Sequence, residues 1–240
     1  MTDSNTNDSL SAEEKHPAMF NAGKLGLFAV VAAFILGGTY SSTADRIAAS
    51  ELEVEQRALL EVVELLEDKD INLEDRIAIE ESDAALLNLE SGESIQVVRN
   101  SQNNAVAFIL PSIAPDGYSG EIKLLLGIDR GGEITGVRVI EHRETPGLGD
   151  KVDIKKSDWI LAFNNKSLSN PEDGWAVTKD GGDFDAFTGA TITPRAVVNQ
   201  IYSTLLYYQE RREDLVEKAN IALEAAMEEV LEEEIEETQP

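Results

Sequence analysis

Cysteine is absent from this sequence of 240 residues. Its absence excludes disulfides, thiolate metal sites, iron–sulfur clusters held by this chain and thioether-linked haem. Basic residues are scarce as well, because 20 lysines and arginines stand against 46 acidic residues, which gives a formal net charge of −26. Nucleic acid is therefore not an expected partner, since binding it requires a basic face that neutralises phosphates. The excess of acidic groups indicates a strongly solvated surface.

A nicotinamide-binding fingerprint is missing too. The glycine-containing run at 180–182 neither follows a clear strand nor opens a helix, as the dinucleotide-binding turn requires. The sequence therefore predicts no substrate that this chain would convert alone. No metal site is predicted either.

One long apolar segment lies near the N-terminus. Residues 25–44 carry no charged side chain, and a transmembrane helix needs about 17–25 mainly apolar residues. A retained signal anchor and a cleaved signal peptide are both open interpretations. We favour the anchor, because the run is longer than the roughly 7–15 residues of a signal-peptide core. Lys24 mildly favours an N-terminus inside the cell, which would make this a single-pass protein of the inner membrane with a periplasmic domain.

The chain divides into five predicted parts, of which the apolar anchor is the second. Residues 1–24 are expected to form a disordered, polar cytoplasmic tail, and residues 45–93 a helical stalk followed by an irregular acidic linker. Residues 94–212 would fold as the globular domain. Residues 213–240 form an acidic tail, helical or disordered, for which solvation is the favoured role and docking of a partner the alternative.

The globular part has the pattern of an α+β domain. Four apolar runs of β-type residues predict a mainly antiparallel sheet, with a hairpin turn at 129–132; the runs lie at 94–99, 105–110, 121–128 and 133–141.

Loops and a long helix complete the prediction. Residues 142–190 are rich in glycine and proline and are expected to form functional loops around a short helix near 157–163. The final helix should begin with Thr193 as its N-cap and Pro194 in its first position, and it should flank the sheet.

The segment before this helix is a candidate phosphate site. A helix start offers free backbone N–H groups and the positive end of the helix dipole. Gly189 and Ala190 leave room beside Thr191, while Thr188 and Thr193 supply further hydroxyls. On these residues alone, a phosphate site and an ordinary junction between loop and helix both remain open.

Residues 185–193, with the sequence Asp-Ala-Phe-Thr-Gly-Ala-Thr-Ile-Thr, resemble the flavinylation motif of a known family. This is the FMN-binding domain shared by the RnfG/RsxG component of Rnf/Rsx complexes and the NqrC component of Nqr complexes. In that family a flavin transferase moves FMN from FAD onto the threonine that closes the Ser/Thr-Gly-Ala-Thr run, which is Thr191 in this sequence. Further stretches that resemble RnfG occur in order at 114–120, 144–151, 157–159 and 175–185.

The resemblance implies a membrane-anchored electron carrier with FMN bound covalently by a phosphoester to Thr191. It would belong to an ion-translocating complex that couples electron transfer between ferredoxin and NAD to ion transport. Its partners would be the other membrane and iron–sulfur subunits, the flavin transferase and the membrane. One alternative is the NqrC component of a sodium-translocating NADH:quinone reductase. The other is a sensory module that binds FMN without relaying electrons.

Loop residues are predicted as further contacts of the cofactor. Gly147 and Leu148, next to Thr145, are expected to lie against the flavin ring, and Trp175 to stack on it. Lys179 is expected to stabilise the reduced flavin, with Lys151 as another candidate. The competing interpretations are a plain turn, a core tryptophan and surface lysines. His142 is interpreted as an exposed residue at a strand end.

Overall fold

The computed structural model describes residues 15–66, 70–171 and 174–238. The chain divides into two compact units, Met1–Glu53 and Val54–Pro240, and helix α1 (Lys15–Val62) passes through this division without a break. The predicted disorder is therefore wrong for residues 15–24, because a helix propagates into flanking residues when each adds a further backbone hydrogen bond. Residues 1–14 lie outside the described part of the chain.

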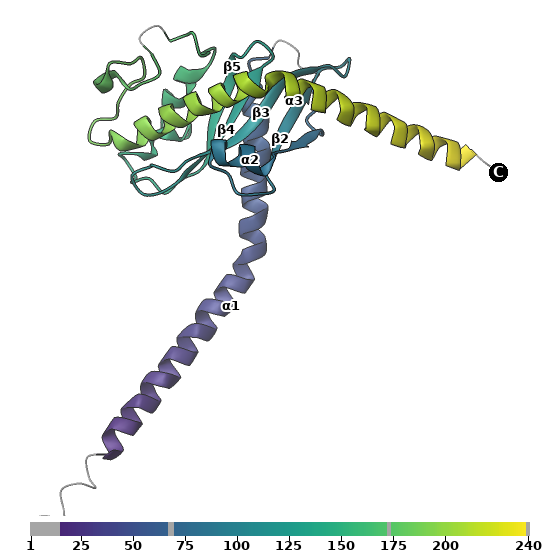
Figure 1. Cartoon of the computed structure of the whole chain (residues 1–240). Helices are drawn as coiled ribbons and strands as arrows, with labels where there is room; N and C mark the ends of the chain where they lie inside the picture. The colour runs from purple at the N-terminus through teal and green to yellow at the C-terminus, as the bar shows by residue number, and fades with distance from the viewer. Residues whose placement is uncertain (1–14, 67–69, 172–173, 239–240) are drawn as a thin grey trace, which may run out of the picture. The chain divides into compact units, whose positions relative to one another are not determined.

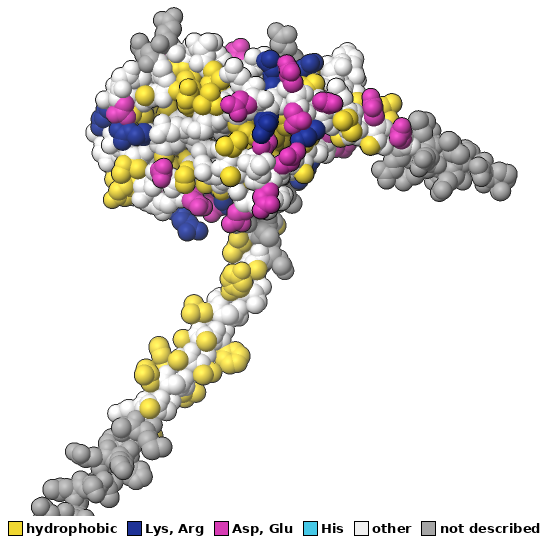
Figure 2. Space-filling view, viewed as in Figure 1, with side chains coloured by type: hydrophobic (Ala, Val, Ile, Leu, Met, Phe, Trp, Pro, Cys, Tyr) yellow, Lys and Arg dark blue, Asp and Glu magenta, His cyan; other side chains and the backbone are white. Residues whose placement is uncertain are grey.

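The first unit contains a candidate membrane span. The segment Phe20–Ala44 is a helix of 25 residues with a mean hydropathy of 1.7, and none of it is buried. Such a helix is roughly 37 Å long at about 1.5 Å per residue, which exceeds the ~30 Å hydrocarbon core of a bilayer. Its apolar side chains are coloured yellow along the helix in Figure 2, and Phe34 is 77% exposed. The predicted apolar anchor thus has the length and the exposure of a span.

The second unit is built on an antiparallel sheet with the strand order β1-β2-β3-β4-β5. The strands are β1 (Arg76–Ala78), β2 (Ser94–Arg99), β3 (Ala105–Ala114), β4 (Ile122–Asp129) and β5 (Ile134–Glu141). The four predicted strands and the hairpin between β4 and β5 are confirmed. The expected irregular linker contains β1, α2 (Glu81–Ala84) and η1 (Ala85–Leu87), which are too short to show a sequence period.

Strand β3 is longer than predicted because it continues through Pro111. Proline lacks the backbone N–H of a central strand and is normally confined to sheet edges or bulges. Here the pairing of β2 with β3 ends at Gln96 and Ile109, so Pro111 has no β2 partner to which it would have to donate. Pairing with β4 continues to Ala114, opposite Ile122.

Helix α3 (Ile192–Thr238) covers one face of the sheet, as Figure 1 shows. The residues that fill this interface are almost fully buried: Phe108, Leu110, Leu124 and Leu126 from the sheet, with Val197, Ile201, Leu205 and Tyr208 from the helix. Polar contacts fix the helix along the sheet. The Tyr208 hydroxyl donates to the carbonyl of Asp129 at 2.9 Å, and Arg99 donates to the carbonyl of Ala219 at 2.5 Å.

The last turns of α1 pack on the opposite face of the sheet, in a second hydrophobic cluster. Gly127 of β4 and Gly136 of β5 are register partners, and the end of α1 lies directly over this pair. A Cβ atom on Gly136 would lie 2.7 Å from Val62 Cα. The Thr135 hydroxyl donates to the Val62 carbonyl at 2.6 Å, which satisfies an acceptor that a helix end leaves free. Glycine at both positions is therefore a condition for this contact.

Replacing Gly136 with alanine should consequently destabilise the fold by about 1–3 kcal/mol, the usual cost of forcing extra atoms into a packed interface. The free energy of unfolding of the purified chain in detergent, measured with a chemical denaturant, tests this. Gly131→Ala is the matched control, because a Cβ atom there meets only the flexible Asp129 side chain, at 3.1 Å. Equal losses in the two variants would contradict the proposed contact.

Candidate functional site

The loop-rich segment 142–190 is held together by aromatic side chains. It contains the short helices η2 (Asp150–Val152), η3 (Asp158–Phe163) and η4 (Thr178–Asp180), and η3 confirms the helix expected near 157–163. Phe163 stacks on Phe184 with ring centroids 4.4 Å apart. Trp159 makes edge contacts with Phe163 and Phe187, at 5.2 and 5.0 Å. This cluster gives a mostly irregular segment a fixed position beside the sheet.

The threonine motif contains a tight turn. The backbone N–H of Ala190 donates to the carbonyl of Phe187 at 3.3 Å, and Gly189 between them has a φ of +84°. A positive φ suits glycine, which has no side chain to clash with the backbone. Thr188 and Gly189 are exposed, and Thr191 is half-buried. The turn therefore presents the Gly-Ala-Thr run at the surface.

Helix α3 begins at Ile192, so the predicted start at Thr193 and Pro194 is wrong by two residues. Proline is tolerated throughout a first helical turn, since the N–H groups there have no partner within the helix. The Thr193 side chain is fully buried and does not cap the helix. Its hydroxyl instead donates to Glu144 Oε2 at 2.5 Å. Thr191 thus stands directly before the helix, closer than the sequence predicted.

Glu144 joins three segments at this point, although it is only 4% exposed. Besides the Thr193 hydroxyl it accepts a hydrogen bond from the backbone N–H of Ser119, at 2.9 Å to Oε1. The space around its carboxylate is narrow. A Cβ atom on Gly149 would lie 2.6 Å from Glu144 Oε2, and one on Gly117 would lie 3.0 Å from Oε1.

The predicted loop at 145–149 lies against the motif. The carbonyl of Thr145 accepts from the N–H groups of Leu148 and Gly149, both at 3.1 Å, and the N–H of Gly147 donates to Asp150 Oδ1 at 2.8 Å. The tip of the Leu148 side chain lies 3.6 Å from where a Cβ atom on Gly189 would stand. The structure therefore brings Leu148 and the Gly-Ala-Thr run together.

Trp175 belongs to the aromatic cluster of the loop segment, and Lys179 lies on the surface. The Trp175 ring packs on Phe184 and Tyr202, with centroids 5.1 and 6.0 Å away, and its indole N–H donates to the carbonyl of Ser167. Trp175 is thus a half-buried member of the aromatic cluster. Lys179 is exposed.

Next to Lys179, Asp180 accepts two hydrogen bonds from Arg195, at 2.6 and 2.9 Å. These bonds hold the pKa of the Asp180 carboxyl below its usual range. The ion pair ties the η4 loop to the first turns of α3.

Two residues of the site, Glu144 and Trp159, were not predicted as functional. Glu144 is part of a stretch that resembles the family, and nothing in the sequence marks it as buried. Trp159 donates its indole N–H to the carbonyl of Asp185 at 2.8 Å, and so holds the segment before the turn.

Lys151, one of the two lysine candidates, lies over the Phe187 ring at 5.9 Å. His142 is half-buried and not exposed, and its Nδ1 accepts from the backbone N–H of Glu144.

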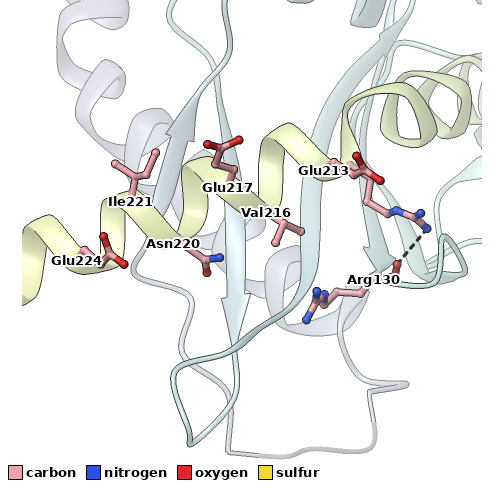
Figure 3. A pocket seen from close by; sticks show the side chains of 8 residues that line it. Arg130, Glu213, Val216, Glu217, Asn220, Ile221 and Glu224 are labelled. Carbon is pink, nitrogen blue, oxygen red and sulfur yellow. Dashed lines mark hydrogen bonds between the residues drawn. The ribbon is translucent and has the colours of Figure 1, made fainter.

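A surface depression lies along the later part of α3, where the helix passes the β4–β5 turn (Figure 3). Basic and acidic side chains both line it; the lining residues are Arg130, Arg212, Glu213, Val216, Glu217, Asn220, Ile221 and Glu224. The expected acidic tail continues this helix to Thr238.

Comparisons with known proteins match both units of the chain. A family model described as FMN-binding domain matches residues 117–205, which include the turn, the Glu144 network and Thr191. A second model, described as RnfG N-terminal region, matches residues 16–62. A crystal structure of Shewanella oneidensis NqrC is 23% identical, with a TM-score of 0.39, and the match covers 55% of this chain and 63% of that one.

Curated relatives match over nearly their whole length. One from Pseudomonas aeruginosa is 42% identical over 208 residues, which is 86% of this chain and 96% of the relative. Another from Pseudoalteromonas atlantica is 41% identical and covers 82% and 90% of the two chains. A third, from Yersinia pestis, is 44% identical and covers 80% and 87%. All three are named as the subunit designated G of an ion-translocating oxidoreductase complex. The chain belongs to this family, the RnfG family.

Proposed function

We propose that this chain is the covalently flavinylated electron carrier of a membrane-bound, ion-translocating oxidoreductase complex. FMN would be attached by a phosphoester to the hydroxyl of Thr191. The observation that carries the proposal is the position of Thr191, half-buried between an exposed glycine turn and the first residue of α3, within the segment matched by the FMN-binding family.

The residues around Thr191 fit a flavin phosphate. Helix geometry leaves the N–H groups of Ile192 and Thr193 without partners inside α3, and the positive end of the helix dipole favours an anion there. Gly189 adds no bulk on the side of the turn. Leu148, 43% exposed, offers an apolar surface beside it for a ring. The predicted contacts of Thr145, Gly147, Trp175 and Lys179 with the flavin remain predictions.

Bound FMN supplies a ring that can accept two electrons and pass them on singly, which suits a relay between one-electron centres. The chain itself contributes position. A covalent link keeps the ring at a high effective concentration, so it is not lost outside the cytoplasm. The Asp180–Arg195 pair and the Glu144–Thr193 hydrogen bond hold the two loops and the start of α3 together around the attachment point.

The remaining parts of the proposal concern place and partners. We infer that α1 is a retained single-pass anchor in the inner membrane, with the FMN-binding domain on the periplasmic side. The other membrane and iron–sulfur subunits of the complex would deliver and remove electrons, and a flavin transferase would attach the cofactor. The NqrC component of a sodium-translocating reductase is the alternative, and the names of the relatives favour RnfG.

Thr191→Ala should abolish covalent flavin, because it removes the proposed acceptor hydroxyl. Protein made together with a flavin transferase is denatured and examined for flavin fluorescence and for the added mass of one FMN minus water. Thr178→Ala is the matched control, since it removes an exposed threonine hydroxyl outside the motif. Covalent flavin on the Thr191 variant would show that the site is wrong.

The anchor should be retained in the mature protein. Intact mass is expected to include the N-terminal residues through Ala44, and the protein should stay in membranes during a high-salt wash. External protease added to spheroplasts should digest the domain if it lies on the periplasmic side. A soluble mature chain starting near Asp45 would replace the anchor by a cleaved signal peptide, and protection from protease would reverse the orientation.

The flavinylated chain should relay electrons without oxidising a substrate of its own. Dithionite is expected to reduce the purified chain in detergent, whereas NADH should not do so at catalytic rates. In native membranes, Thr191→Ala should stop ferredoxin-linked turnover while the complex still assembles, with Thr178→Ala as the control. Rapid oxidation of NADH by the purified chain would make it an enzyme in its own right.

A further inference from the structure

The three motif threonines differ sharply in environment. Thr188 is exposed in the turn, Thr191 is half-buried, and Thr193 is fully buried. The hydroxyl of Thr193 is already committed, since it donates to Glu144 Oε2 at 2.5 Å. Of the two threonines next to the helix start, Thr191 therefore has the accessible hydroxyl.

The carboxylate that holds Thr193 is itself held in place. Glu144 accepts the Ser119 N–H at its other oxygen, its own N–H donates to His142 Nδ1 at 3.1 Å, and its side chain is 4% exposed. Glycine at 117 and 149 is what allows the surrounding backbone to approach so closely. Because the Glu144 side chain is buried and both of its oxygens accept hydrogen bonds, it restricts the position of the Thr193 side chain that donates to it.

We propose that Glu144 is a positioning residue for flavin attachment, which fixes the first turn of α3 through Thr193 and thereby orients the Thr191 hydroxyl. The inference rests on the proposed function. In the transfer, Thr191 Oγ1 forms a bond to the FMN phosphorus of FAD, the phosphoanhydride bond to AMP breaks, AMP leaves, and the hydroxyl proton is released. No electrons are exchanged. Glu144 takes no part in these bond changes.

Glu144 can influence Thr191 because Thr193, which it binds, is close to Thr191 along the chain. Thr193 is two residues after Thr191 and lies within the first helical turn. When its hydroxyl is bound to Glu144, the turn is held against the 117–120 and 145–149 loops. Loss of that bond frees the first turn to shift, and misplacing an attacking group by about 1 Å can slow a reaction on the order of a hundredfold.

Rates of covalent flavin incorporation into the full-length chain in detergent, with FAD and the flavin transferase, test the proposal. Thr193→Val keeps the shape of the side chain and removes the hydroxyl. Thr204→Val is the matched control, because Thr204 is also fully buried on α3 and its hydroxyl donates within the helix, to the Gln200 carbonyl at 2.9 Å. Thr193→Ser keeps the hydroxyl. Glu144→Gln changes the acceptor.

We expect Thr193→Val and Glu144→Gln to slow incorporation on the order of tenfold to a hundredfold, through kcat with KM for the protein acceptor unchanged. Thr193→Ser and Thr204→Val should react at the wild-type rate. The double variant Glu144→Gln/Thr193→Val should be no slower than the slower single variant, since both break one interaction. Thermal unfolding is recorded for every variant, so that a rate loss confined to the Glu144–Thr193 pair is separated from a general loss of stability.

Equal rates for Thr193→Val and Thr204→Val would overturn the proposal, as would a rise in KM with kcat unchanged. Failure of the proposed function is a different result. In that case the wild-type chain itself would take up no covalent flavin, or would carry it on a residue other than Thr191.

Discussion

The packing of α3 across one face of the sheet is the constraint on which the position of the site depends. Val197, Ile201 and Leu205 repeat every four residues and are buried almost completely against β3 and β4. This periodicity fixes both the rotation of the helix and where its first turn lies. The loops that follow β5 return to that end of the helix, so Glu144 and Leu148 lie beside the motif that contains Thr191, although this loop and the motif are far apart in the sequence. Displacing the helix would disperse all three.

Buried charge is arranged differently in the sheet and in the site. Arg99 pairs with Asp75, and Arg138 with Glu61, so each buried guanidinium faces a carboxylate. Glu144 has a backbone N–H and a hydroxyl as its hydrogen-bond donors. Burial of a charged group is costly unless its hydrogen-bonding capacity is used, and here both oxygens accept a hydrogen bond. Because both of these donors are neutral, the position of Glu144 depends on the directions of its hydrogen bonds.

The sequence was sufficient for the strands whose alternation is long enough to recognise, for the apolar helix and for the threonine motif. The sequence was insufficient where tertiary contacts determine whether an element forms or where it begins and ends. Strand β1 has three residues and exists because β2 offers it a paired edge. Pro111 does not end β3 because the neighbouring strand stops first. Helix α3 begins earlier than predicted because the Thr193 hydroxyl donates to Glu144, 49 residues earlier in the sequence, and does not serve as the N-cap. Local helix propensity contains no information about such a distant hydrogen bond.

The predicted roles of Trp175 and Lys179 beside the flavin came from residue type alone. The Trp175 ring has aromatic partners in the loop, and Lys179 is exposed next to the Asp180–Arg195 ion pair. The contacts of Trp175 identify it as a member of the aromatic cluster, while its contact with the flavin, like that of Lys179, stays a prediction.

The contact of the end of α1 with Gly127 and Gly136 has a consequence for proteolytic cleavage of the chain. Ala58, Val62 and Val63 complete the second hydrophobic cluster together with Val98, Ala107 and Ile109. A protease that cut between residues 45 and 53 would release a fragment that keeps both clusters intact. A cut after residue 66 would instead leave one face of the sheet uncovered, with apolar strand residues open to water and to other copies of the fragment. The solubility of a fragment released from a membrane would therefore depend on whether it keeps the last two turns of α1. In the sequence, these turns look like part of the stalk.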